Sequence, residues 1–170
     1  ESIKAINMGA SAIGTGINVD LKYFSIIVPN LSKLSGYKLR REDDLIDQTS
    51  NLDSLVEISS VLKTNAVNLS KISNDLRLLS SGPKTMIGDI ILPARQNGSS
   101  IMPGKINPVI PEVVSQVSFR VIGNDLTVTM AAEAGQLQLN AFEPVIFYSI
   151  YQSIEMLTAA METLRLNAIE

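Results

Sequence analysis

The sequence predicts an all-α protein in which long antiparallel helices form a bundle and a long Gly/Pro-rich loop joins two of them. Three observations lead to this prediction. Leucines recur every seventh residue between Ser50 and Pro83, the repeat of a helix that packs in a bundle or coiled coil. Two further long segments, beginning at Pro111 and Pro144, carry apolar residues at helical spacing. No segment alternates as a half-buried strand would, with "GDIILPA" (88–94) as the one candidate.

The first helix is predicted from Asp20 to Gly36, where apolar residues recur every three or four positions and Pro29 is a potential kink. Before it lies "NMGASAIGTGIN" (7–18), which contains three glycines. This segment does not meet the dinucleotide-binding fingerprint, since no strand precedes it and Val19 stands where a third glycine is needed. It is either a packed turn or a loop that lines a site.

The second helix is predicted between about residues 51 and 80, and Gly82 followed by Pro83 marks its end. At about 1.5 Å per residue it would be roughly 45 Å long. Such a helix cannot be covered within a compact chain of this size, so we expect other chains to bury its seam. The seam consists of Leu55, Leu62, Leu69 and Leu76, flanked by Ile58, Ile72 and Leu79 and interrupted by Asn65.

The third helix is predicted to open at Pro111 and Glu112, because proline fits the first turn and an acid there complements the helix dipole. Gly123 and Gly135 lie inside the predicted helix and indicate close helix packing, a kink or a site. The last helix is predicted to open at Pro144. Its expected core stripe is Phe147, Ile150, Ile154, Leu157, Met161 and Leu164.

Composition excludes several classes of function. The net charge is −3 and no basic face stands out, so nucleic acid is not an expected partner. The chain has no cysteine and no histidine, which excludes disulfides, Cys-based zinc sites, thiol nucleophiles and a histidine base within it. No apolar run approaches the roughly 20 residues of a membrane span. A cytoplasmic protein with no membrane contact is therefore expected.

The connection from Pro83 to Pro111 is unusually long for a compact domain, and loops beyond about 12–15 residues tend to be functional. Five of the seven prolines lie in it, at 83, 93, 103, 108 and 111. A rigid linker is the alternative. Within "GSSIMPGKINP" (98–108), the spacing of the glycines and the presence of Ile106 do not fit a phosphate-binding loop.

Another chemistry fits the same loop better. Lys105 supplies a fixed positive charge and Asn107 supplies an amide donor. Gly98, Ser99 and Ser100 supply backbone N–H groups and hydroxyls. Together these groups suit a carboxylate that gains negative charge during a reaction.

"GSSIMPGKINP" resembles the signature of the aspartase/fumarase superfamily, whose members eliminate ammonia, water or another group to give fumarate. The segments "NLSKISNDLRLLSSGP", "ILPARQ", "NPVIPEVV" and "VIGNDLTVTMAAEAGQLQLN" resemble the ammonia-lyases of this superfamily that act on L-aspartate. Asn97 departs from the proline expected there, which affects no chemical group. The resemblance covers essentially the whole chain.

The resemblance implies that Ser99 is the catalytic base, and that Ser100, Lys105 and Asn107 bind substrate and stabilise a dianionic intermediate. Glu112 matches an acidic residue near the family's site. No metal ligand and no cofactor are implied, and activation by a divalent cation is left open. Because a serine hydroxyl is a weak base and no histidine is present, backbone N–H groups and Lys105 are the remaining means of activation.

The resemblance further implies that residues 1–170 form a single domain, most of the central helical domain of a longer lyase whose N-terminal and C-terminal domains lie outside this chain. The chain begins without Met, which agrees with that expectation. Family members are homotetramers that act on dicarboxylates, and three subunits form each active site. The chain by itself is therefore expected to be inactive. The alternatives are a fumarase, another fumarate-forming lyase, or a helical oligomerisation module without activity.

Overall fold

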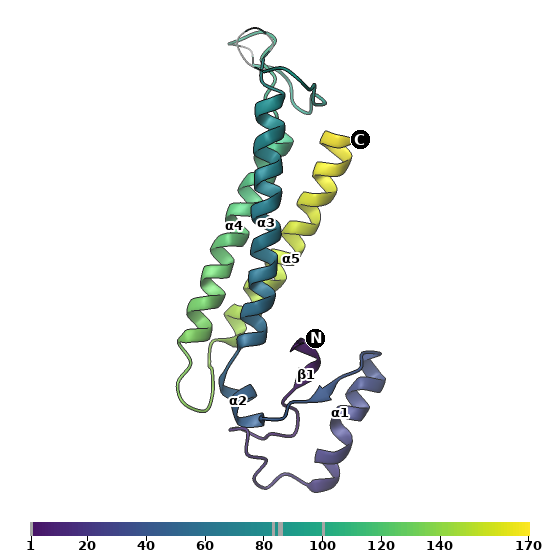
Figure 1. Cartoon of the computed structure of the whole chain (residues 1–170), viewed down its shortest axis with the longest axis vertical. Helices are drawn as coiled ribbons and strands as arrows, with labels where there is room; N and C mark the ends of the chain where they lie inside the picture. The colour runs from purple at the N-terminus through teal and green to yellow at the C-terminus, as the bar shows by residue number, and fades with distance from the viewer. Residues whose placement is uncertain (1, 83, 85–86, 100) are drawn as a thin grey trace. The chain divides into compact units, whose positions relative to one another are not determined.

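Helices make up most of the chain, which confirms the predicted all-α class. The computed structural model describes residues 2–82, 84, 87–99 and 101–170. Within these ranges the one sheet has two strands of two residues each. The elements are η1 (Ser2–Lys4), β1 (Ala5–Ile6), α1 (Leu21–Ser35), β2 (Arg40–Arg41), α2 (Leu45–Ser50), α3 (Asp53–Leu79), α4 (Val109–Glu133), α5 (Glu143–Leu164) and η2 (Arg165–Ile169), a π-helical turn (Figure 1).

The chain divides into two compact units, which are described separately. Unit 1 consists of Glu1–Ile58 and Thr127–Tyr148, and unit 2 consists of Ser59–Leu126 and Ser149–Glu170. Unit 2 carries the long loop between α3 and α4 and therefore all of the predicted site residues. That residues 1–170 are most of one central helical domain stays a prediction.

In unit 1, α1 begins and ends where the sequence predicts. The carboxylate of Asp20 accepts hydrogen bonds from the backbone N–H groups of Lys22 and Tyr23, at 2.8 and 2.9 Å. Gly36 closes the helix with a φ of +75°, and its N–H donates to the carbonyl of Ser32. These two caps satisfy backbone groups that a helix leaves open, so local sequence is enough to set its bounds.

Two strands and a short helix of unit 1 are absent from the sequence prediction. β1 and β2 pair in parallel, with Ala5 opposite Arg40, although neither is long enough to show an alternating pattern. The short helix α2 is capped by Asp44, whose carboxylate accepts from the N–H groups of Ile46 and Asp47. The candidate strand at 88–94 is wrong, since that segment has no strand in the structure.

The glycine-rich segment before α1 is a packed turn. Gly9, Gly14 and Gly16 all have positive φ, a conformation that side chains disfavour. A Cβ atom on Gly14 would lie only 2.4 Å from the Cα of Ile46, at the start of α2. Of the two interpretations that the sequence allows, the geometry favours packing.

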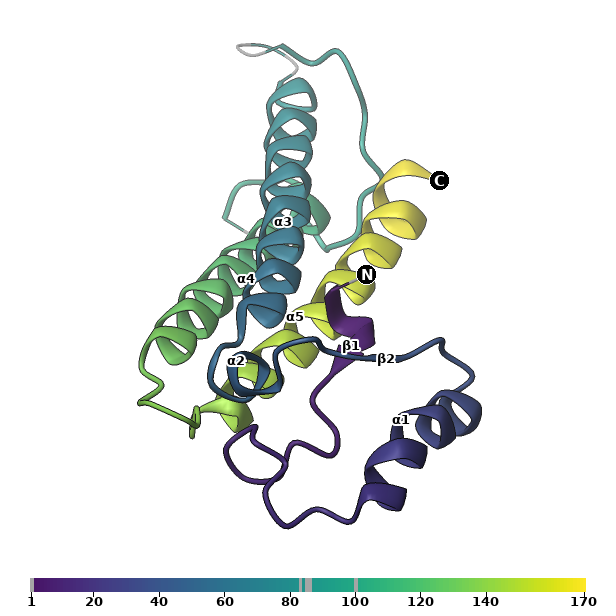
Figure 2. The ribbon, with the colours of Figure 1, turned by 60° about the horizontal axis from the view of Figure 1, so that its bottom comes forward.

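Unit 2 is built on three helices that lie side by side, with α4 antiparallel to both α3 and α5 (Figures 1 and 2). Two apolar clusters hold them together. One has Val114, Ala160, Leu164 and Ala168 at its centre, with Leu69, Leu76, Ile110 and Val117 against it. The other has Ala66, Val121 and Leu157, with Leu62, Leu69 and Val117 against it. The bundle thus fixes the two helix ends that the long loop connects.

The leucine seam of α3 packs in part inside the chain, and burial of the remainder by other chains stays a prediction. Leu62, Leu69 and Leu76 are partly buried against α4 and α5. Smaller side chains of α3, which also recur every seventh residue, are buried more deeply than these leucines. They are Ser59, Ala66 and Ser73, with exposed fractions of 4%, 0% and 0%. Small side chains allow the helices to approach closely.

α4 begins at Val109, two residues earlier than predicted, and ends at Glu133. Gly135 therefore lies beyond the helix, contrary to the prediction. The side-chain amide of Asn140 donates to the carbonyls of Ala131 and Ala132, so a residue outside the helix satisfies its last turn.

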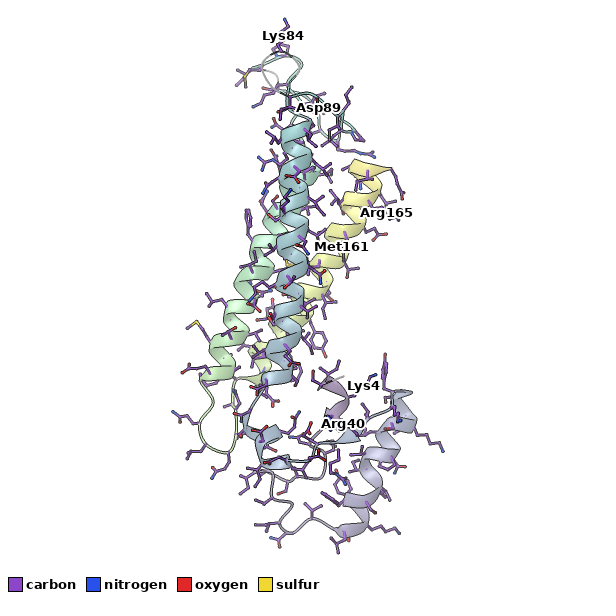
Figure 3. All side chains as sticks on the ribbon, viewed as in Figure 1. Lys4, Arg40, Lys84, Asp89, Met161 and Arg165 are labelled. Atoms are coloured by element: carbon purple, nitrogen blue, oxygen red, sulfur yellow. The ribbon has the colours of Figure 1, made fainter. Side chains whose placement is uncertain are left out.

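The predicted stripe of α5 is only half right. Ile150, Leu157 and Leu164 are buried, whereas Phe147, Ile154 and Met161 are 39–46% exposed. Figure 3 labels Met161 on α5. The buried face includes Ser153 and Ala160, which a search for large apolar residues overlooks.

Buried polar groups also join the helices of unit 2. The carboxylate of Asp125 accepts a hydrogen bond from Ser59 Oγ at 2.8 Å and pairs with Lys63 Nζ at 2.6 Å. The side-chain amide of Asn124 donates to the carbonyl of Ser149 at 3.3 Å and to Ser153 Oγ at 3.0 Å. Asp125 thus links α4 to α3, and Asn124 links α4 to α5.

Candidate active site

The segment after Ser99 folds back on itself through a tight turn. Pro103 and Gly104 occupy the two central positions of a β-turn in which the N–H of Lys105 donates to the carbonyl of Met102 at 3.1 Å. The φ of Gly104 is +84°, the value that a type II turn requires at its third residue. The N–H of Ser99 then donates to the carbonyl of Lys105 at 3.2 Å and closes the segment. The sequence "MPGK" therefore brings Lys105 back beside Ser99.

Gly98 makes this closure possible. A Cβ atom at this position would lie 3.2 Å from the carbonyl oxygen of Lys105, tighter than ordinary van der Waals contact. The same oxygen accepts the hydrogen bond from Ser99. A side chain at position 98 would therefore press on the contact that closes the turn.

The hydroxyl of Ser99 has two backbone donors. Its Oγ accepts hydrogen bonds from the N–H groups of Ile101 and Met102, both at 3.2 Å, and the residue is half-buried. Serine side chains often bond the backbone in this way at turns. The same two donors also stabilise the oxygen when it carries negative charge, as in an oxyanion hole. The turn thus provides a physical means of charging a serine in a chain without histidine.

Lys105 and Asn107 differ in their surroundings. The side chain of Lys105 is exposed, whereas Asn107 is half-buried and lines a cavity of about 610 Å³ between the end of α3 and the long loop. The carbonyl of Asn107 accepts the N–H of Val109 at 2.9 Å, at the start of α4. Of the described site residues, neither Ser99 nor Lys105 lines this cavity. Ser100, the other serine of the predicted pair, lies outside the described residues.

Glu112 lies in the first turn of α4, as predicted, and its Oε1 is 3.9 Å from Nη2 of Arg77 in the last turn of α3. The two side chains are 34% and 43% exposed, so water screens the pair. Within the described parts of the chain, no side-chain hydrogen bond joins Glu112 to Ser99, Lys105 or Asn107. The structure therefore brings Ser99 and Lys105 together but leaves Glu112 with Arg77.

Arg77, in the last turn of α3, and Arg95, within the long loop, make contacts that sequence reasoning missed. Arg77 belongs to the last turn of α3, where a basic residue is favoured by the helix dipole, and that position was a usable signal. Arg95 donates from Nε to the carbonyl of Asn167 at 3.1 Å and from Nη2 to the carbonyl of Leu166 at 3.3 Å. Its partners lie more than 70 residues away, so no local pattern indicates them.

No group of three or more His, Cys, Asp or Glu residues that could hold a metal ion occurs among residues 2–82, 84, 87–99 and 101–170. Over the same ranges, none of the helices combines the length and hydropathy needed to cross a membrane.

Known proteins resemble the chain along its whole length. Aspartate ammonia-lyase of Bacillus sp is 53% identical over 165 residues, which cover 97% of this chain and 35% of that protein. Aspartate ammonia-lyase of Pseudomonas fluorescens is 57% identical over 169 residues, which cover 99% of this chain and 35% of that protein. The chain thus spans about 35% of the length of these curated relatives.

Solved structures share the fold. The crystal structure of fumarate lyase:delta crystallin from Brucella melitensis bound to cobalt matches with a TM-score of 0.94 and 53% identity, over 98% of this chain and 36% of that chain. A class II fumarase from Schistosoma mansoni matches with a TM-score of 0.88 and 31% identity, over 98% of this chain and 38% of that chain. The profile of the lyase family, described simply as "Lyase", matches residues 1–123. The chain therefore belongs to this lyase family.

Proposed function

We propose that this chain is part of an enzyme that eliminates ammonia from L-aspartate to give fumarate. The observation that carries the proposal is the pair of backbone N–H groups on Ser99 Oγ. The identity of about half to relatives named aspartate ammonia-lyase supports the choice of substrate. Because the chain spans about 35% of those relatives, the activity belongs to the longer protein that contains it.

In the proposed reaction, Ser99 Oγ acts as an alkoxide and removes a proton from the carbon beside one carboxylate of aspartate. The N–H groups of Ile101 and Met102 stabilise the negative charge on Oγ before the transfer. The proton ends on Ser99. The electron pair of the broken C–H bond moves into the carboxylate, which becomes an enediolate-like dianion.

Lys105 is the proposed electrostatic partner of that dianion. Its backbone is bonded to Ser99, so the ammonium group starts from a fixed point near the base, and its exposed side chain is free to reach a substrate. Asn107 and Ser100 are proposed to donate hydrogen bonds to the substrate carboxylates. When the dianion collapses, its electron pair forms the C=C bond of fumarate, and ammonia leaves with the electrons of the C–N bond.

Glu112 is proposed to act in support. Its contact with Arg77 joins the first turn of α4 to the last turn of α3, where the loop starts and ends. This role requires no proton transfer and no direct contact with substrate.

The experiment is an assay of the full-length protein that contains this chain. L-Aspartate should yield fumarate, followed by its ultraviolet absorbance, together with an equal amount of ammonia. Fumarate made from L-malate but not from L-aspartate would establish the fumarase alternative. No turnover of either substrate, by a folded full-length protein, would favour a helical module without activity.

We also propose that the full-length protein is a cytoplasmic homotetramer. Exposed apolar side chains on all three helices of unit 2 support the assembly, because large exposed apolar surface usually marks an interface. They are Ile72 and Leu78 on α3, Phe119 and Leu126 on α4, and Tyr151, Ile154 and Met161 on α5. The absence of cysteine agrees with a reducing compartment.

A further inference from the structure

The pair Asn97–Gly98, directly before the proposed base, has the residue types that favour a spontaneous reaction of the chain with itself. It is the one place among the 170 residues where glycine follows asparagine. Glycine has no Cβ, so its backbone nitrogen is the least hindered one that can follow an asparagine. Both residues are exposed and lie outside any helix, in the long loop of unit 2. The side chain of Asn97 and the nitrogen of Gly98 are therefore close neighbours with no bulky group between them.

The backbone N–H of Gly98 is not held by the fold. Within the part of the chain that the structure describes, this N–H donates no hydrogen bond, and the side-chain amide of Asn97 makes none either. The next N–H, that of Ser99, is bonded to the carbonyl of Lys105 at 3.2 Å. An N–H that is bonded in a helix or a sheet resists reaction, because the bond has to break first. The nitrogen of Gly98 needs no such step.

We propose that Asn97 is a site of self-modification, which deamidates through a succinimide and thereby limits the working life of the enzyme. The nitrogen of Gly98 loses its proton to solvent base and attacks Cγ of Asn97, so that an N–Cγ bond forms. The Cγ–Nδ2 bond breaks, and Nδ2 takes up a proton from water and leaves as ammonia. A five-membered ring remains between the two residues.

Water then opens the ring in one of two ways. Cleavage of the new N–Cγ bond gives aspartate at position 97 on an unchanged backbone. Cleavage between the nitrogen of Gly98 and the main-chain carbonyl carbon of residue 97 gives isoaspartate, in which the chain runs through the former side chain. Both products carry a carboxylate where Asn97 carried a neutral amide. Water is the only co-reactant, and nothing is oxidised or reduced.

Isoaspartate changes the backbone in front of Ser99. The chain becomes longer by one carbon atom, about 1.5 Å. Gly98 lies close against Lys105, since even a Cβ atom on Gly98 would be 3.2 Å from the carbonyl oxygen of that lysine. The N–H of Ser99 donates to the same oxygen. The added carbon should therefore displace Ser99 from its place beside Lys105. This effect on turnover rests on the proposed function, whereas the chemical change at Asn97 does not.

The chemical test follows the full-length protein during incubation in mildly alkaline buffer, where more backbone nitrogen loses its proton. Mass spectrometry of peptides should show residue 97 gaining the mass that separates an acid from its amide. Protein isoaspartate methyltransferase with a radioactive methyl donor should label the same residue. Asn18 is the internal control, because it is exposed and non-helical but is followed by Val19. Residue 97 should convert about tenfold faster or more, since a β-branched side chain hinders the nitrogen that must attack.

The kinetic test compares aged wild-type enzyme with two variants. Asn97→Gln would need a six-membered ring, which closes far more slowly, so it should start with wild-type kcat and keep it. Freshly purified Asn97→Asp carries the new charge on a normal backbone, so it should raise KM for a dicarboxylate with little change in kcat. Aged wild type should lose kcat as the label appears, by about 10²-fold in the isoaspartyl form, the effect of a displacement of about 1 Å.

Repair supplies a further readout. The same methyltransferase with unlabelled methyl donor returns isoaspartate to the ring and then in part to aspartate, so it should restore part of the lost kcat. A loss of kcat that follows the label, is repaired in this way and is absent from Asn97→Gln supports the proposal.

Three results would overturn it. They are no label at residue 97 of the folded protein, conversion no faster than that of Asn18, and a loss of kcat that is equal in Asn97→Gln or absent from fully labelled enzyme. Fresh wild-type protein that makes no fumarate from L-aspartate would overturn the proposed function instead. In that case the methyl label would still decide whether Asn97 is modified.

Discussion

The hydroxyl of Ser99 receives two backbone N–H groups, and replacing it tests whether that arrangement serves catalysis. Ser99→Ala in the full-length enzyme should lower kcat by about 10²–10⁴-fold, the usual contribution of a general base. KM should change little, because the lost interaction exists only in the transition state. Steady-state kinetics of fumarate formation measures both constants.

The matched control for this substitution is Ser81→Ala, since Ser81 lies in the same loop and its hydroxyl donates to the carbonyl of Leu78 at the end of α3. It should keep the wild-type kcat. A Ser99→Ala enzyme that retains more than about a tenth of wild-type kcat would exclude Ser99 as the base, given the size of that contribution.

In the proposed mechanism the charge of Lys105 acts both in substrate binding and in the transition state, so its loss should affect both KM and kcat. Lys105→Ala should raise KM and also lower kcat by about 10²–10³-fold, as expected when a preorganised electrostatic partner is removed. Lys84→Ala is the control, because Lys84 is an exposed lysine of the same loop. Equal effects of the two substitutions would show that general charge, and not the position of Lys105, attracts the substrate.

At the scale of the elements, the pair Lys63–Asp125 should carry much of the attachment of α3 to α4. Asp125→Ala leaves the buried Ser59 hydroxyl without its acceptor and Lys63, whose side chain is 40% exposed, without its partner, which should lower the free energy of unfolding by about 1–2 kcal/mol. Asp75→Ala breaks the exposed i,i+4 pair with Lys71 and should cost less than about 1 kcal/mol. Urea unfolding of both variants makes the comparison. Equal losses would show that burial adds nothing to the first pair.

Local signals predicted some helix ends well and others poorly. Asp20 and Gly36 bound α1 because their caps involve only neighbouring residues. The end of α4 depends on the distant amide of Asn140, so a continuous apolar pattern extended the prediction too far. On α3 the leucines of the predicted seam are partly buried against α4 and α5, whereas Ser59 and Ser73, which the pattern of apolar residues omits, are almost fully buried.

The candidate site divides in the same way. Pro103 and Gly104 indicate a turn, and the return of Lys105 towards Ser99 follows from that turn. Neither the direction of the N–H groups on Ser99 Oγ nor the partner of Arg95 can be read from residue types. The first depends on backbone angles within the turn, and the second involves residues more than 70 positions away in the sequence.

For the whole molecule, the position of the apolar residues decides which substitutions affect assembly. Phe119 and Ile154 are 60% and 42% exposed, so Phe119→Lys with Ile154→Lys should dissociate the oligomer and leave each subunit folded. Leu62→Lys should instead unfold the chain, because Leu62 packs against the internal cluster of α4 and α5. Light scattering reports the mass and circular dichroism reports the helix content.

A wild-type full-length protein that is monomeric at micromolar concentration would contradict the proposed tetramer. Dissociation by Leu62→Lys with full helix content would contradict the internal packing of α3.

The donors on Ser99 Oγ are backbone groups, and this has a consequence for mutational scanning. Replacing the side chains of Ile101 and Met102 leaves both N–H groups in place, so an alanine scan should score these positions as tolerant. Replacing either peptide bond by an ester, through total or semisynthesis, removes one donor and keeps the side chain. The ester variants should lose turnover whereas the alanine variants should not. That difference would assign a catalytic role to the backbone N–H groups of Ile101 and Met102, which side-chain substitution leaves in place.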